Sequence, residues 1–285
     1  MSGFDIDIGR LREAFDQAAS SYDDHAVLQH EVGDRMLERL DYVRLNPQLI
    51  LDVGCGTGRG SEALLKRYAG SRVVGLDLSP GMLGHARRRG RWRRRPAVVC
   101  GDVRQLPVGA ERVDLIYSNL TLQWCCADLD RVLAEFRRVL RRRGLLMFTS
   151  FGPDTLKELR ASWGRVDGRP HVNDFLDMHD IGDALLRSGF ADPVMDMEML
   201  TVTYADPLDL MRDLKRIGAV NVNAGRQRGL MGREHLRAVC EAYEAFRLPD
   251  GRYPATYEVI YGQAWVPDAP PPMQMSPGVI PIIQK

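Results

Sequence analysis

Residues 51–58 read LDVGCGTG, and an apolar segment leads into them while a helical pattern follows at 60–69. A chain that turns sharply from a strand into a helix needs unusual backbone angles, which glycine supplies, and a missing Cβ lets a ligand approach the main chain. The free N–H groups at the start of the new helix favour a carboxylate or a phosphate. The stretch therefore predicts a ligand-binding turn between a strand and a helix.

Three acidic side chains end the first three predicted strands. Asp52, just before the glycines, can pair with an ammonium, so the turn indicates an amino-acid ligand. Asp77 lies nineteen residues after Gly58, where an acid typically accepts from ribose hydroxyls. Asp102 can accept from an adenine amino group. These groups stand at the carboxyl ends of strands, where open α/β sheets bind ligands.

Short apolar segments alternate with helical stretches from residue 48 onward. Strands that alternate with helices predict a parallel sheet with crossover helices, and continuous apolar strands are typical of a sheet buried on both faces. The helical stretch at 128–142 carries one apolar stripe. The segment at 256–266 alternates like a half-exposed, antiparallel strand. The apolar segments are LILDVG (49–54), SRVVGLDL (71–78), AVVCGD (97–102), VDLIYSNL (113–120) and GLLMFTSF (144–151).

The chain divides into five predicted parts. The first 45 residues have helical periodicity, and the stretch 153–250 is too long for a simple crossover, so we interpret it as a mostly helical insertion that caps the sheet. The expected parts are lid helices (1–45), a cofactor-binding core (46–152), the helical cap (153–250), a closing strand (251–266) and a flexible proline-rich tail (267–285).

The composition is that of an ordinary globular protein. The chain has 285 residues, 45% of them hydrophobic and 27% charged, which excludes a wholly disordered, collagen-like or coiled-coil protein. The net charge of +1 indicates no particular partner. No apolar run is long enough to cross a membrane, and MSGFDIDIGR is no signal peptide, so we expect a cytoplasmic protein without a membrane partner. We also expect a monomer.

The cysteines and an arginine-rich run both have ordinary structural interpretations. Five cysteines, including the neighbours Cys125 and Cys126, show no metal-like spacing, so we expect reduced thiols and no metal. The run RRRGRWRRR at 87–95 holds seven arginines in nine positions. We interpret it as an exposed basic segment and expect no nucleic-acid partner.

The glycine turn together with its three acids resembles the class I S-adenosylmethionine-dependent methyltransferases over residues 45–150. A nicotinamide dehydrogenase is the alternative, but its loop usually reads G-x-G-x-x-G, whereas this one reads G-x-G-x-G. The resemblance implies a Rossmann-like α/β fold with a seven-stranded, mostly parallel sheet, N-terminal helices and a helical cap. It also implies S-adenosylmethionine as cofactor, held by Gln29, Asp52, Gly54, Gly56, Gly58, Asp77, Leu78, Met82, Asp102, Val103, Asn119 and Leu120.

The core sequence indicates the methyl acceptor more weakly than it indicates the cofactor. The segment at 118–124 lacks the Asn/Asp-Pro-Pro-aromatic motif of DNA amino-methyltransferases, and no Cys-His or His-Asp pair is placed to act as a base. A carboxylate needs no base to remove a proton, because its pKa is about 4 and it is ionised at neutral pH. This favours a carboxylate acceptor.

Segments outside the core resemble the malonyl-acyl-carrier-protein O-methyltransferases of biotin synthesis over residues 8–266. The same segments also resemble a mitochondrial complex-I assembly factor that hydroxylates an arginine, and a small-molecule methyltransferase of menaquinone type stays open. The segments are AASSYD (18–23) with Gln29, TSFGPDTLKELR (149–160), MRDLKRIGA (211–219) and PATYEVIYG (254–262).

The biotin-family resemblance implies methyl transfer to the free carboxylate of a malonyl thioester, on an acyl carrier protein or on CoA. It places Tyr22, Ser150 and Arg160 at the acceptor, with the arginine as a carboxylate anchor. Acyl carrier proteins are acidic, so we expect them to dock on a basic helix face made by Arg212, Lys215 and Arg216.

Overall fold

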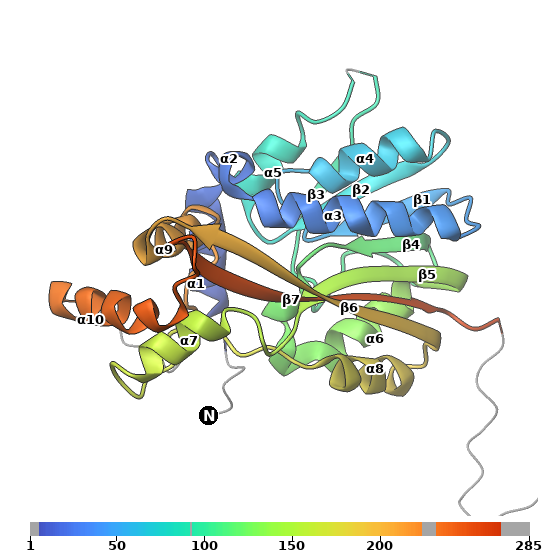
Figure 1. The fold of residues 1–285 in the computed structure, drawn as a ribbon. Helices are drawn as coiled ribbons and strands as arrows, with labels where there is room; N and C mark the ends of the chain where they lie inside the picture. Colours follow the sequence, from blue (N-terminus) through green and yellow to red (C-terminus); the bar gives the residue numbers. More distant parts are fainter. Residues whose placement is uncertain (1–5, 92, 224–231, 269–285) are drawn as a thin grey trace, which may run out of the picture.

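The computed structural model describes residues 6–91, 93–223 and 232–268. Within these residues one sheet has seven strands in the order β3-β2-β1-β4-β5-β7-β6 (Figure 1). The first five strands are parallel, and β7 pairs antiparallel with both β5 and β6. The strands are β1 (Leu49–Val53), β2 (Arg72–Asp77), β3 (Ala97–Cys100), β4 (Val113–Ser118), β5 (Leu140–Phe151), β6 (Ala191–Tyr204) and β7 (Tyr253–Trp265). The predicted Rossmann-like, mostly parallel sheet is confirmed.

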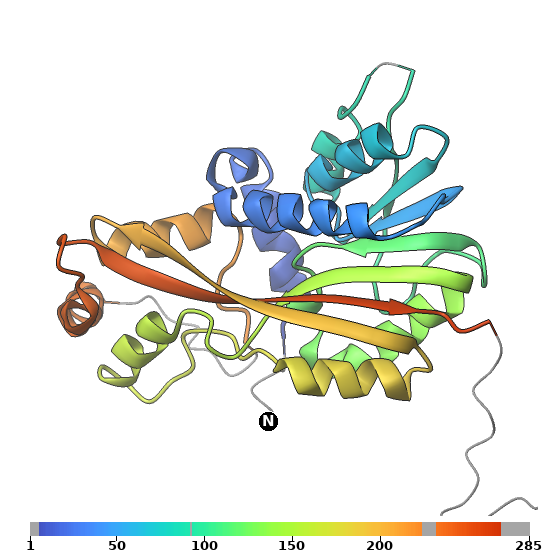
Figure 2. The same ribbon diagram turned by 45° about the vertical axis from the view of Figure 1, so that its right-hand side comes forward.

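Helices cover both faces of this sheet, as its continuous apolar strands predict. Neighbouring strand residues enter different cores: Leu115 and Tyr117 pack with α3 and α4, whereas Ile116 packs with α6 and α8. Figures 1 and 2 show the two helix layers on either side of the strands. The helices are α3 (Val27–Arg39), α4 (Arg59–Arg67), α5 (Pro80–Ala86), α6 (Leu129–Val139) and α8 (Met178–Arg187).

The remaining helices gather where the parallel strands end. In both views β6 and β7 continue past the core toward this end, beside α7, α9 and α10 (Figures 1 and 2). The short 3-10 helix η2 (Leu122–Trp124) follows β4 at the same edge. The helices are α1 (Ile8–Ala18), α2 (Tyr22–His25), α7 (Lys157–Gly164), α9 (Pro207–Arg216) and α10 (Arg233–Tyr243). The N-terminal and cap segments thus meet over the carboxyl edge of the sheet.

Two predicted helical stretches contain strand residues. The cap (153–250) contains the whole of β6, whose sequence ADPVMDMEMLTVTY is rich in methionine and acids and lacks a clear strand signal. Its acids face a helix: Asp196 pairs with Arg39 of α3 at 2.8 Å. The helix predicted at 128–142 ends at Val139, because the following arginines start β5 beside β4.

The described helices include none that is both long and apolar enough to cross a membrane. Of the tail predicted to be flexible (267–285), all residues from 269 onward lie outside the described residues.

Candidate functional site

The glycine turn has the backbone that the sequence predicts. Gly54, Gly56 and Gly58 have φ angles of 68°, 53° and 85°, the left-handed region that favours glycine. A Cβ on Gly54 would lie 2.0 Å from the Thr121 hydroxyl oxygen, whereas one on Gly56 would meet nothing within 4 Å. The main chain at Gly56 is therefore open to a ligand. Gly58 caps α4 and lies behind the turn.

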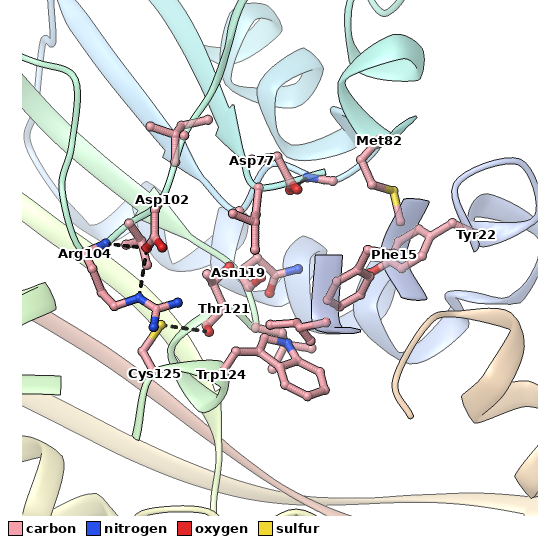
Figure 3. A pocket seen from close by; sticks show the side chains of 18 residues that line it. Phe15, Tyr22, Asp77, Met82, Asp102, Arg104, Asn119, Thr121, Trp124 and Cys125 are labelled. Atoms are coloured by element: carbon pink, nitrogen blue, oxygen red, sulfur yellow. Dashed lines mark hydrogen bonds and ion pairs between the residues drawn. The ribbon is translucent and has the colours of Figure 1, made fainter. Parts of the chain in front are cut away.

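A cleft of about 730 Å³ opens beside this turn (Figure 3). Figure 3 shows Asp102 and Arg104 at one end and Tyr22 and Met82 at the other. The cleft brings together ten of the predicted site residues: Tyr22, Gly54, Gly56, Asp77, Leu78, Met82, Asp102, Val103, Asn119 and Leu120.

Asp77 is fixed at the end of β2 by two backbone N–H groups. Its Oδ2 atom accepts from Gly56 N and its Oδ1 atom from Ser79 N, each at 2.8 Å. Burial raises the pKa of this carboxyl group, and the backbone donors oppose the shift. The carboxylate is thus rigidly aimed at the cleft and has further lone pairs for hydroxyl donors.

Asp102 pairs with Arg104, which is not among the predicted site residues. Its Oδ1 atom accepts from the backbone N and from Nε of Arg104, both at 2.9 Å. Arg104 also contacts Asp128 at 3.1 Å, so the guanidinium is held from two sides. Because it follows Asp102 by only two residues, a local turn places it in the cleft.

A second cavity of about 520 Å³ adjoins the cleft and contains Asp52 and Gln29. Tyr22 and Asn119 line both spaces, so they mark where the two meet. Asp52 is buried and accepts from the Ser61 hydroxyl at 2.5 Å. Burial raises its pKa to about 7, with Ser61 opposing the shift and Asp77 adding to it.

An apolar wall closes the cleft opposite the acids. Phe15 of α1 and Trp124 of η2 meet edge to face with ring centroids 5.7 Å apart. Leu11 of α1 and Cys125 also line the cleft. None of these four is among the predicted site residues. For Leu11 and Phe15, the helical pattern tells which side of α1 is apolar but not what that side covers.

The three predicted acceptor residues are placed differently from one another. Tyr22 lines the cleft, and burial raises the pKa of its phenol well above the usual value, with Asp77 and Asp23 adding to the shift. Ser150 is buried in β5, where its hydroxyl donates to Phe151 O at 3.4 Å. The Arg160 guanidinium donates to two backbone carbonyls, those of residues 153 and 173, at 2.9 and 3.3 Å. Only Tyr22 lies in the cleft.

Thr149, the neighbour of Ser150, contacts the site instead. Its hydroxyl donates to Asn119 Oδ1 and accepts from Leu120 N, both at 2.8 Å. Asn119 Nδ2 donates in turn to the Gln29 carbonyl at 3.0 Å. Leu120 has a positive φ of 50°, which is uncommon for a residue with a side chain. This chain of bonds joins β5, the loop after β4 and α3.

The predicted docking residues are exposed on α9. Arg212 pairs with Asp209 at 2.7 Å, and Arg216 lies 3.5 Å from Asp213. The opposite face of α9 is apolar and includes the buried Leu210. Lys215 and Arg216 line an open cleft between α1 and α9, which Arg10 of α1 also lines.

Comparison with known proteins reveals close relatives. A family model described as a methyltransferase domain matches residues 51–148. A protein of Laribacter hongkongensis named malonyl-[acyl-carrier protein] O-methyltransferase is 52% identical over 96% of this chain and 95% of its own length. One of Legionella pneumophila with the same name is 42% identical, over 90% of this chain and 89% of its own.

Solved structures share the fold at low identity. The YcgJ protein from Bacillus subtilis has a TM-score of 0.59 and 16% identity, and the match covers 84% of this chain and 100% of that one. Phosphoethanolamine N-methyltransferase 2 of Haemonchus contortus, solved with S-adenosylhomocysteine, has a TM-score of 0.51 and 17% identity, covering 82% and 52% of the two chains. These likenesses support the fold alone.

Proposed function

The chain belongs to the family of malonyl-[acyl-carrier protein] O-methyltransferases, and on this premise we propose that it methylates the free carboxylate of a malonyl group carried by an acyl carrier protein. The observation that carries the proposal is identity of 52% over 96% of the chain, far beyond the cofactor core that many methyltransferases share. The relatives favour neither the arginine-modifying nor the menaquinone-type alternative.

The cleft suits S-adenosylmethionine, which supplies a methyl group activated on a sulfonium. Asp77 faces the space where ribose hydroxyls would donate, and the open backbone at Gly56 suits the carboxylate of the amino-acid part. Asp52, in the adjoining cavity, would pair with the ammonium. Leu78 and Val103 would flank the adenine beside Asp102.

The acceptor needs to be positioned rather than activated. A carboxylate is ionised at neutral pH, so no protein base has to remove a proton. Tyr22 stays a neutral phenol because burial raises its pKa. We propose that Tyr22 orients the acceptor and excludes water where the two cavities meet. Good alignment of two reacting groups can supply about 7–11 kcal/mol of a barrier.

The carrier would dock on the exposed face of α9. Arg212, Lys215 and Arg216 lie on this face, and Arg10 lines the neighbouring cleft together with Glu13. Acidic partners are steered to such surfaces over a distance that salt shortens. Two of the α9 cations already have acidic neighbours on the same helix, so Lys215 and Arg10 are expected to contribute most.

Complementation tests the function in a cell. A biotin auxotroph that lacks this methylation step should grow without biotin when it expresses the chain, and the Asp77→Ala variant should support growth poorly. Both strains should grow equally when biotin is added. Failure of the well-expressed wild-type chain to restore growth would contradict the proposed function.

A further inference from the structure

A third, partly open cavity adjoins the cofactor site on its cap side. It shares Trp124 with the cleft and Gln29 with the cavity that contains Asp52. Residues from β5, α7, α9 and β7 enclose it, and most are apolar. Among them are Phe151, Leu159, Val172, Phe175, Leu214 and Ile217.

Most polar side chains of this cavity are bonded to the protein itself. The Thr155 hydroxyl donates to Glu258 O at 3.2 Å, and Asn221 donates to Pro170 O at 2.6 Å. His171 contacts Asp167 at 2.8 Å. The described residues that line the cavity include no lysine or arginine. The cavity therefore suits an uncharged, largely apolar segment of a ligand.

Gln123 has one side-chain atom that is paired and one that is not. Only 3% of this residue is exposed, and its Nε2 atom donates to Leu120 O at 2.7 Å. That bond fixes the orientation of the amide and leaves Oε1 buried, with no partner among the described residues. An unpaired buried acceptor is costly, so a ligand that brings a donor would be favoured.

We propose that this cavity holds the thioester arm of the acyl carrier and that Gln123 Oε1 accepts a hydrogen bond from an amide N–H of the arm. The inference rests on the proposed function. The part of the arm next to its sulfur is an uncharged run of methylene groups and two secondary amides, which matches an apolar cavity that contains the unpaired Gln123 Oε1. Its carboxylate end would reach the Trp124 and Gln29 border of the cofactor site.

The position of the docking helix supports this occupant. Leu214 of α9 lines the cavity, while Lys215 lies on the exposed side of the same helix. A carrier bound to the basic face of α9 would therefore have its arm next to the cavity. An amide N–H of the arm can then pair with Gln123 Oε1, and an arm without such a donor leaves this oxygen unpaired.

Malonyl-pantetheine and two analogues test the proposal, each analogue having one of the two amides replaced by an ester. With the wild type at saturating S-adenosylmethionine, kcat/KM should fall about tenfold for at least one ester analogue. Gln123→Met should lower kcat/KM for the amide substrate by a similar factor and remove the difference between the substrates. Its affinity for S-adenosylmethionine must be measured as well, because Gln123→Met also removes the bond to Leu120 O beside the cofactor cleft.

A matched variant separates this effect from general damage. Gln263 is a half-buried glutamine of β7 that lines a different groove, so Gln263→Met should keep the amide preference. If the wild type uses all three substrates equally, the acceptor holds a water only and the proposal is wrong, whether or not Gln123→Met folds. An amide preference that survives in Gln123→Met would also overturn it. A wild type that methylates no malonyl thioester overturns the proposed function, and this inference with it.

Discussion

Asp52 shows how burial and ligand charge act on one carboxyl group. Its pKa of about 7 means that at lower pH much of the unliganded protein carries a neutral Asp52. A neutral acid does not pair with an ammonium, so binding there must first remove the proton. As the pH rises through about 7 the group ionises by itself, and the affinity for the cofactor should increase.

The first prediction follows from this shift. Calorimetric affinity for S-adenosylmethionine should increase between about pH 5.5 and 7, by at most about tenfold per pH unit, because one proton is released. Asp52→Asn should bind more weakly and lose most of this pH dependence. A wild-type affinity that stays constant over this range would exclude Asp52 as the ammonium partner.

The second prediction concerns Asp77. Asp77→Ala should weaken S-adenosylmethionine binding by about 1–3 kcal/mol, because the ribose hydroxyls lose their acceptor. The backbone N–H groups of Gly56 and Ser79 lose the same partner, so the melting temperature must be measured beside the affinity. Unchanged affinity in a folded variant would place Asp77 outside the site.

The third prediction concerns Tyr22. Burial raises its pKa, so its phenol does not ionise near neutral pH. Turnover of the wild type should stay flat with pH well above the pKa of the substrate acid, and Tyr22→Phe should lower kcat without changing that profile. A rise in turnover with pH that is lost in Tyr22→Phe would mean that the tyrosine acts as a base.

At the residue scale the sequence predicts backbone-determined positions best. The glycines and Asp77 follow from the strand–turn–helix pattern, whereas Phe15 and Trp124 reach the cleft only through tertiary packing. The end of β5 shows the limit clearly. Neighbouring strand residues point to opposite faces, so choosing Ser150 in place of Thr149 exchanges a residue that contacts the site for one that does not.

At the element scale, α2 joins the glycine turn to α9, the proposed docking helix. Asp23 of α2 accepts from the Thr57 hydroxyl at 2.6 Å and also pairs with Arg89. On its other side, His25 lies 3.6 Å from Asp213 of α9. Arg89 belongs to the arginine-rich run, so this part of the run has a structural partner at the lid. The periodicity of the first 45 residues predicts helices but not these contacts.

The fourth prediction concerns α9. Reversing Arg212, Lys215 and Arg216 to Glu should raise KM for malonyl-acyl carrier protein and spare malonyl-CoA, and the wild-type KM for the carrier should rise with salt. Reversing the exposed Arg72, Arg142 and Arg143, at the starts of β2 and β5, should affect neither substrate. Equal losses on both substrates for the α9 variant would mean that the helix shapes the active site instead.

At the scale of the whole molecule, three distant parts of the sequence build one site. The N-terminal helices supply Phe15 and Tyr22, the parallel strands supply the acids, and the cap encloses the third cavity. The order of elements predicts the parallel sheet and its binding edge, because βα alternation leaves few topologies. It does not predict how the cap packs, since β6 is an edge strand with a weak pattern of its own.

A methyl-transfer assay on defined acceptors tests most directly whether the chain methylates the carboxylate of a malonyl group. Labelled S-adenosylmethionine is supplied with carrier-bound malonyl, acetyl and butyryl groups, an arginine peptide and a quinone precursor, and each product is identified by mass. We expect a methyl ester on the malonyl group alone, because malonyl is the only one of the supplied acyl groups that ends in a free carboxylate. Methylation of the quinone precursor or modification of the arginine, with malonyl-acyl carrier protein untouched, would contradict it.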